Sequence, residues 1–536
     1  MGNAQFELSW IDFTVVAVYF VGIIAHGVYV SRKLKGGSDD YFLAGRSLPW
    51  YLIGFSLFAS NMSGSSFVGL MGGAYSNGVS IFNYEWTAAF VLILFAIFIL
   101  PSYLRAKIGT VPEYLEYRYD VRSRRAFSLF TILAIMFIDT AGALYAGGLV
   151  ISNVTEYLNI WTAVAVLALV AGLYTILGGL SAVVVTDTVQ AVLLICGAAA
   201  LFWIGLNEIG GWSQLWEGIP ERKQHLILSA DDEFLPWTGL WGVVLLGFYY
   251  WTINQFVVQR TLGAKNLREG QTGALFAGFL KLPNLFLMIL PGIIALQLYP
   301  DLETPDLAFP SLAFDLMPVG LRGLIMAALI AAIMSSLDSA LNSASTLVVK
   351  DFVQPFRPGI SEGRMVGIGR IVTGVVMVFG AVYSPFIGSF ESLFSYFQSS
   401  LSYIIPTIVV VYILGLFVPW LNGTGAFWTI VFGLVVGIPL FLAKEVTGVW
   451  EAAGLPAIHY TIMSTVMMFA GIVLHVGLSA ATRTTPEERK HVDELVWSRE
   501  EFVHVFTRWE RPLWRDRTIW SGVLILALAG TIAWFW

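Results

Sequence analysis

The sequence predicts an all-α polytopic membrane protein with about fourteen transmembrane helices. Of its 536 residues, 57% are hydrophobic and only 12% are charged, and the mean hydropathy is +0.74. Soluble domains carry about 25% charged residues, so this composition excludes an ordinary soluble fold. Several apolar segments exceed the roughly 20 residues that cross a bilayer as a helix, which favours helices over barrel strands. The single cysteine excludes an internal disulfide framework and a CxxC metal site.

Hydropathy places the spans along the whole chain. They lie near residues 10–31, 49–75, 81–104, 126–151, 158–177, 183–205, 237–258, 272–299, 319–349, 365–386, 392–418, 425–443, 457–479 and 518–535. The first segment lacks a basic leader and a cleavage site, so we expect a retained helix. About 25 of the 30 basic residues fall in loops on one side. The positive-inside rule therefore supports this number of spans and predicts that both termini lie outside the cytoplasm, in the plasma (inner) membrane.

Two polar connectors separate groups of spans. Residues 207–236 are predicted to form an extracellular loop, and residues 480–517 a cytoplasmic one. The cytoplasmic loop mixes both charge signs with aromatics at roughly helical spacing. This pattern is typical of an amphipathic connector on the membrane surface, and a regulatory docking role is the alternative.

Five charged side chains lie well inside the predicted spans: Glu85, Asp139, Asp187, Lys281 and Asp338. Each costs about 3 kcal/mol or more at the bilayer centre, so each needs a partner, water or an ion. Four acids against one lysine predict an electronegative interior that a cation neutralises. Architectural salt bridges are the alternative explanation for any single acid.

The segment AAIMSSLDSALNS concentrates polar residues in one span. At about 100° per residue, one helix face carries Ser335, Asp338, Ser339, Asn342 and Thr346, flanked by Ser336 and Ser343. Close helix packing would explain the serines alone, but not the carboxylate. Hard cations prefer oxygen ligands, and this face has neither His nor Cys, so it favours sodium or a similar ion.

A second segment predicts a broken helix. The stretch SLFASNMSGSSFVGLMGGAYSNG, residues 56–78, has a centre of low helix propensity. A break there would free backbone carbonyls for a cation. A continuous helix of small, tightly packed residues is the alternative.

Four segments together resemble the sodium/solute symporter family, which includes the sodium/glucose cotransporters. They are SLFASNMSGSSFVG with YEW at 84–86, GGLSAVVVTDTVQ at 178–190, YYWTINQFVVQRTLGAK at 249–265, and AALIAAIMSSLDSALNSAST at 327–346. The likeness spans essentially the whole chain and is greatest to the bacterial sodium/galactose branch. It implies a LeuT-type fold of two inverted five-helix repeats. The implied parts are a first helix and loop at 1–48, repeats at 49–206 and 237–419, and C-terminal helices at 420–536.

The resemblance also implies sodium as the coupling ion. The positions that match the family's main sodium site are Ala59, Met62 and Ala332, which offer carbonyls, and Ser335 and Ser336, which offer hydroxyls. A second cation site, present in some members, matches Asp187, Ser335, Asp338 and Ser339. Serine or alanine is common where this chain has Asp338, so this acid either strengthens cation binding or carries a proton. Two cation sites per cycle are our hypothesis.

The matching solute-binding positions are Ser66, Glu85, Asp139, Lys281 and Gln398. The gate positions are Leu70, Tyr84, Tyr250, Trp251 and Phe394. Four polar contacts differ from the galactose pocket, at Ser66, Ala88, Asp139 and Gly247, and a missing partner costs about 1–3 kcal/mol, so galactose itself does not follow. Asp139 could recognise an amine or pair with Lys281.

The expected function is sodium-coupled import of a small polar solute, a sugar or polyol foremost, by alternating access. Amino sugars, sialic acid, carboxylates and amines stay open, as does a transporter-like sensor. A channel would need a continuous polar pore, and an enzyme would need a nucleophile with a base or a metal cluster; neither pattern occurs in the sequence. The expected partners are the solute, sodium ions and the lipid bilayer, without nucleic acid. The oligomeric state stays open.

Overall fold

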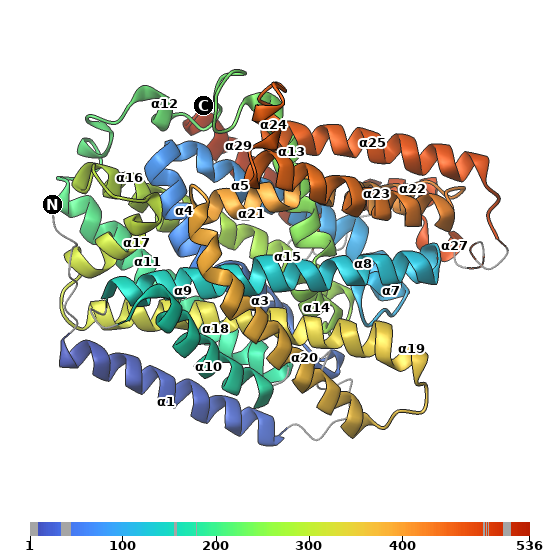
Figure 1. Ribbon diagram of the computed structural model, residues 1–536, viewed down its shortest axis with the longest axis horizontal. Coiled ribbons are helices and arrows are strands. Elements are labelled where there is room, and N and C mark those ends of the chain that lie inside the picture. The colour runs from blue at the N-terminus through green and yellow to red at the C-terminus, as the bar shows by residue number, and fades with distance from the viewer. Residues whose placement is uncertain are drawn as a thin grey trace.

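The computed structural model describes residues 9–33, 44–154, 158–177, 180–485, 488, 490, 492–507 and 516–536. Throughout these ranges the regular elements are helices, with only isolated β-bridges between them. Most of the long helices run along one common direction (Figure 1). This arrangement suits a bundle that spans a bilayer, because helices satisfy their own backbone hydrogen bonds.

Each predicted span coincides with a helix or with a chain of helices. In order, these are α1 (Trp10–Lys33); α3 and α4 (Trp50–Asn61, Gly64–Asn77); α5, η3 and α6 (Asn83–Leu94, Phe95–Ile99, Leu100–Arg105); α8, η4 and α9 (Val121–Ala134, Ile135–Thr140, Ala141–Val154); α10 (Ile160–Leu177); α11 (Leu180–Glu208); α13, η7 and α14 (Leu240–Phe248, Tyr249–Ile253, Gln255–Leu262); α15, η8 and α16 (Leu267–Lys281, Leu285–Ile289, Leu290–Leu298); α18 (Leu321–Leu347); α20 (Glu362–Tyr383); α21 and α22 (Leu393–Ser402, Ile405–Phe417); α23 (Gly423–Phe441); α25 (Tyr460–Ala481); and α29 (Arg517–Trp534).

Fewer segments than the predicted fourteen meet the length and hydropathy criteria for a membrane span. In the described ranges, 8 helices are long and apolar enough to cross a membrane, or up to 11 if each of 3 bent pairs counts as one span. The multi-span character is therefore confirmed, and the total of about fourteen stays a prediction.

Helix α18 lies in the interior of the bundle. It contacts α1, α3, α11 and α20, and its residues from Ile325 to Leu347 are all buried. Helix α1 packs on α18 and α11 at one edge, whereas α23 and α25 pack together at the opposite edge (Figure 1). The polar face of α18 is therefore turned into protein and away from lipid, as the sequence predicts.

The predicted break in the second span is present. Helix α3 ends at Asn61, and Met62 leaves the helical region with φ −80° and ψ 64°. Ser63 is extended and starts α4 by accepting a hydrogen bond from the backbone N–H of Ser66 at 3.2 Å. A Cβ atom on Gly64 would lie 2.4 Å from Ile333 of α18, so α4 can begin this close to α18 only with glycine there.

A second break occurs in the span of residues 237–258. Helices α13 and η7 end before Asn254, which has ψ 121°, and the axis bends by 45° before α14. The Asn254 side chain then caps α14 by accepting from the N–H of Phe256 at 3.2 Å. Both predicted repeats thus contain a broken first helix.

The described loops gather at two ends of the bundle. At one end, the C-terminal Phe535 carbonyl accepts from the N–H of Leu226 at 2.8 Å, and Asp12 of α1 caps α18 through the N–H of Gly320 at 2.7 Å. The other end holds basic loops, where Arg46 donates to the Lys107 carbonyl at 3.1 Å. The start of α1 and the C-terminal residues therefore lie at the same end, away from these basic loops.

Candidate solute and sodium site

The break between α3 and α4 faces the serines of α18. The Ser336 hydroxyl lies 3.0 Å from the Ala332 carbonyl and 3.5 Å from that of Ser60. Ala59 and Met62, at the end of α3, are fully buried. Because the last carbonyls of a helix have no partner within it, α3 offers backbone oxygens here. Hydroxyl and carbonyl oxygens therefore lie close together in the protein interior. Oxygen ligands of this kind suit a sodium ion. The ligand roles of Ala59, Met62, Ala332, Ser335 and Ser336 stay a prediction.

Three of the four second-site residues come together around a buried ion pair. Asp187 of α11 accepts hydrogen bonds from Ser335 and, at 2.5 Å, from Ser56. Arg260 of α14 lies 3.2 Å from the Asp187 carboxylate and also donates to Ser339. The side chains of Arg260 and Asp187 are 1% and 0% exposed.

Arg260 corrects one expectation from the sequence. The sequence predicts a span that ends at residue 258, which puts Arg260 in a basic cytoplasmic loop at 259–268 and leaves Lys281 as the single interior cation. That assignment was wrong, because Arg260 is fully buried and donates to the Ser56 hydroxyl at 2.7 Å and to the Phe256 carbonyl. The interior is accordingly less electronegative than predicted.

Asp338 is buried on α18 and interacts electrostatically with Tyr19 of α1. The Tyr19 hydroxyl accepts a hydrogen bond from Gln190 of α11 at 3.1 Å. These neighbours place Asp338 near the seam between α1, α11 and α18. Its role in binding an ion or a proton stays a prediction.

A polar cluster lies on the solute side of the break. Lys281 of α15 donates to Glu85 of α5 at 2.8 Å and to the Asn61 side chain at the end of α3. Asn284 donates to the same Glu85 carboxylate and contacts the Met62 sulfur at 3.4 Å. Lys281 pairs with Glu85, so the alternative pairing of Lys281 with Asp139 was wrong.

A cavity of about 160 Å³ opens beside this cluster. Its lining includes four of the five predicted solute residues, Ser66, Glu85, Asp139 and Gln398, and all five predicted gate residues, Leu70, Tyr84, Tyr250, Trp251 and Phe394. Lys281 lies behind Glu85, 5.1 Å from the centre of the Trp251 ring. Pockets for drug-sized ligands measure about 300–1,000 Å³, so this cavity suits a compact solute.

Sequence reasoning missed Asn61 and Asn284. Both are polar residues inside apolar spans, so the criterion that found the charged residues would have found them if it had included amides. Ser63 and Ser65 also line the cavity and lie in the predicted break. Among the described residues, Asp139 has no ion-pair partner.

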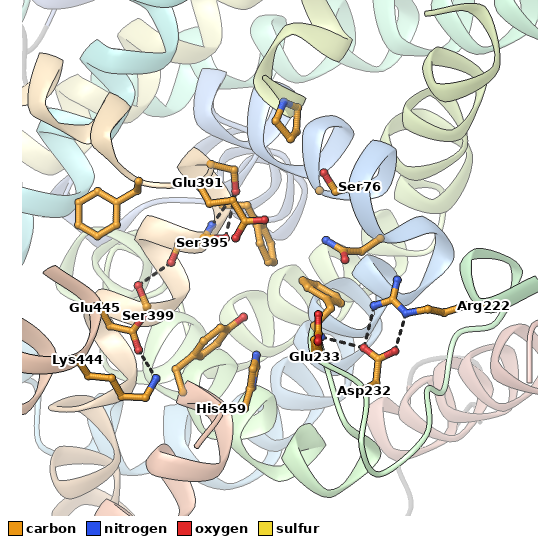
Figure 2. Close-up of a pocket in the computed structure, with 18 of the residues that line it drawn as sticks. Ser76, Arg222, Asp232, Glu233, Glu391, Ser395, Ser399, Lys444, Glu445 and His459 are labelled. Carbon is orange, nitrogen blue, oxygen red and sulfur yellow. Dashed lines mark hydrogen bonds and ion pairs between the residues drawn. The ribbon is translucent and has the colours of Figure 1, made fainter. Parts of the chain in front are cut away.

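A larger hollow of about 870 Å³, here called the vestibule, lies beyond the cavity. Ion pairs stand on opposite sides of it, Arg222–Asp232 at 2.6 Å and Lys444–Glu445 at 2.8 Å (Figure 2). Phe394 lines both the vestibule and the cavity. Its ring meets that of Tyr84 edge to face, with centroids 4.8 Å apart, so these two rings stand between the two spaces.

Comparisons with known proteins point to one family. The family model described as "Sodium:solute symporter family" matches residues 41–433. A sodium/glucose cotransporter of Vibrio parahaemolyticus is 34% identical, with 82% of this chain and 86% of the relative covered. Sodium/glucose cotransporter 4 of Danio rerio is also 34% identical, with 96% and 85% covered.

Solved structures share the fold. That of a Na⁺-coupled sialic acid symporter has a TM-score of 0.76 at 23% identity and covers 89% of this chain and 99% of its own. A nucleobase-cation-symport-1 family transporter has a TM-score of 0.51 at 14% identity, with 85% and 98% covered. The fold is LeuT-type, and the coupling ion is sodium. The family match, the relatives and the broken helices together establish that this multi-pass membrane chain belongs to the sodium:solute symporter family.

Proposed function

We propose that this protein imports a small neutral sugar or polyol, coupled to sodium entry, by alternating access. The observation that carries the proposal is the compact cavity with Glu85 and Gln398 in its wall, aromatic rings around it and Lys281 behind it. Carboxylate, amide and ammonium groups suit the hydroxyls of a sugar ring, and aromatic faces suit its apolar surface. The relatives named sodium/glucose cotransporters support the same solute class.

The charges around the cavity argue against an anionic solute. Lys281 is already neutralised by Glu85, and Asp139 adds a carboxylate to the lining. An anion would therefore meet negative charge without a free cation among the described lining residues. An amino sugar is the second candidate, because Asp139 could pair with its ammonium group.

Sodium binding would prepare the cavity for the solute. An ion held by Ala59, Met62, Ala332, Ser335 and Ser336 would fix the broken helix against α18 and favour the outward-open state. Solute binding then closes the gate residues Leu70, Tyr84 and Phe394 over the cavity. Rocking of the core opens the inner side past Tyr250 and Trp251, and sodium leaves to the low-sodium cytoplasm. Each sodium ion gains about 2.3 kcal/mol per 100 mV of membrane potential. The solute is carried without chemical conversion.

We further infer that both termini lie outside the cytoplasm of the plasma (inner) membrane. The basic loops would then face inward, as the positive-inside rule requires. The pairing of the C-terminus with residue 226 and of α1 with the start of α18 supports a common side for the two termini. The proposed repeats are residues 49–206 and 237–419.

Uptake into proteoliposomes tests the function. Radiolabelled glucose and galactose, a polyol, glucosamine and sialic acid are each offered with an inward gradient of sodium or of potassium. We expect sodium-dependent accumulation of a neutral sugar or polyol, and its loss in Lys281→Met. Sodium-dependent uptake of sialic acid alone would refute the charge argument. Absence of sodium-dependent uptake for every solute would refute transport and favour a sensor.

A further inference from the structure

An aromatic lid covers the solute cavity on its vestibule side. Its members are Tyr84 and Phe394, predicted as gate residues, together with Phe234 and Tyr460. The Tyr84 and Tyr460 hydroxyls form a hydrogen bond of 2.7 Å. The centroids of the Phe234 and Phe394 rings lie 6.3 Å apart. Phe234, Phe394 and Tyr460 line the vestibule, and Tyr84 and Phe394 line the cavity. The lid is therefore the partition between the two spaces.

Tyr460 lies outside the segment that the family model matches. It is the first residue of α25, whereas the family match ends at residue 433. Helix α25 belongs to neither proposed repeat. A helix added after the repeats thus supplies one hydroxyl of the only hydrogen bond found between lid side chains in the described residues.

The start of α25 is held firmly against the core. A Cβ atom on Gly242 of α13 would lie 2.2 Å from the Thr461 carbonyl, and one on Gly239 would lie 2.1 Å from the Thr461 hydroxyl. These distances are far below van der Waals contact, so only glycine allows this approach. Tyr460, next to Thr461, is therefore fixed relative to α13, and its neighbour His459 caps the helix through the Thr461 N–H at 3.3 Å.

We propose that Tyr460 is a positioning residue of the outer gate: its hydroxyl holds Tyr84 in the closed lid. The proposal rests on the proposed transport function. In the open lid the Tyr84 side chain would be separated from Tyr460, so the hydrogen bond would stabilise the closed state over the open one. Removing either hydroxyl leaves the other one buried without a partner in the closed lid. This lowers the ratio of closed to open protein by about tenfold.

Thiol accessibility measures this ratio directly. The single cysteine, Cys196, is replaced by serine, and Ala143→Cys places a reporter in the cavity wall. Right-side-out vesicles then receive a membrane-impermeant methanethiosulfonate, with sodium present, and the rate of modification is recorded. The series comprises the parent, Tyr84→Phe, Tyr460→Phe and the double variant.

The control is Tyr299→Phe. The Tyr299 hydroxyl donates to Asp315 at 2.6 Å on the same side of the protein, but neither residue lines the vestibule or the cavity. We expect each single lid variant to raise the modification rate by about tenfold, the double variant, which strands no hydroxyl, to raise it less than either single variant, and the control to match the parent.

Two outcomes would overturn the proposal: an unchanged rate in Tyr460→Phe, or rates in the double variant that equal the product of the single effects. If Tyr460→Phe is not produced as folded protein, Tyr84→Phe tests the same bond from the core side, and an unchanged rate there also overturns it. Uptake measured in parallel separates this result from the proposed function. A parent without sodium-dependent uptake refutes transport, whereas the modification rates still report the lid.

Discussion

Neutralising one partner of the Asp187–Arg260 pair should destabilise the protein far more than neutralising both. The two side chains are 0% and 1% exposed and lie 3.2 Å apart. Asp187→Asn leaves a buried guanidinium without its counter-charge, and Arg260→Gln leaves a buried carboxylate. Removing one partner of such a pair costs about 3–5 kcal/mol. The double variant has no isolated charge, so its cost should be far below the sum, with a coupling energy of about 3 kcal/mol.

Denaturant unfolding in detergent micelles provides the four free energies of the cycle. A matched cycle at Arg105–Glu501 is the control, since those side chains are 37% and 41% exposed. Exposed pairs contribute about 0–1 kcal/mol, so its coupling energy should be small. A coupling energy at Asp187–Arg260 no larger than that of the control would refute the reasoning. It would mean that water or other groups already compensate each charge.

Ser335→Ala and Ser336→Ala should each raise the sodium concentration for half-maximal uptake by about tenfold, because each removes one proposed oxygen ligand; unchanged sodium activation would contradict the main site. Lys281→Met should abolish uptake and destabilise the fold by about 3 kcal/mol, and adding Glu85→Gln should restore most of the stability but not the uptake; melting curves and uptake together check this. Burial raises the pKa of Asp306, in the loop before α18, to about 6. Its ionised form therefore weakens the fold, so the free energy of unfolding should fall by at most about 3 kcal/mol between about pH 4 and pH 6 and stay low above that. Asp306→Asn should flatten this slope in denaturant titrations, and an unchanged slope would contradict the assignment.

The spans and the first break could be predicted because their signals are local. Hydropathy reports a stretch of about 20 residues, and the Ser, Asn and Gly residues around Met62 have low helix propensity wherever they occur. The polar face of α18 could likewise be predicted from its helical period. The solute and gate residues, by contrast, came from the family resemblance.

The pairing of charges could not be predicted, because it depends on contacts between distant segments. Arg260 lies in α14, beyond the break at Asn254, and every residue of α14 is buried although the axis has bent by 45°. The positive-inside rule counts every arginine near a span end as a loop residue, so it assigned Arg260 to the cytoplasm. Lys281 had two carboxylates to choose from, Glu85 and Asp139, and nothing in the sequence distinguishes them. Only packing of α15 against α5 decides in favour of Glu85.

The geometry at the break suggests how sodium and solute influence each other. Asn61, the last residue of α3, contacts Lys281, and the Met62 side chain contacts Asn284, which donates to Glu85. The backbone of Met62 is also a proposed sodium ligand. An ion that fixes this backbone would therefore fix the side chains that hold the Glu85–Lys281 pair, and the solute would in turn hold the backbone in place for the ion. Because such coupling is reciprocal, solute must raise sodium affinity by the same factor by which sodium raises solute affinity.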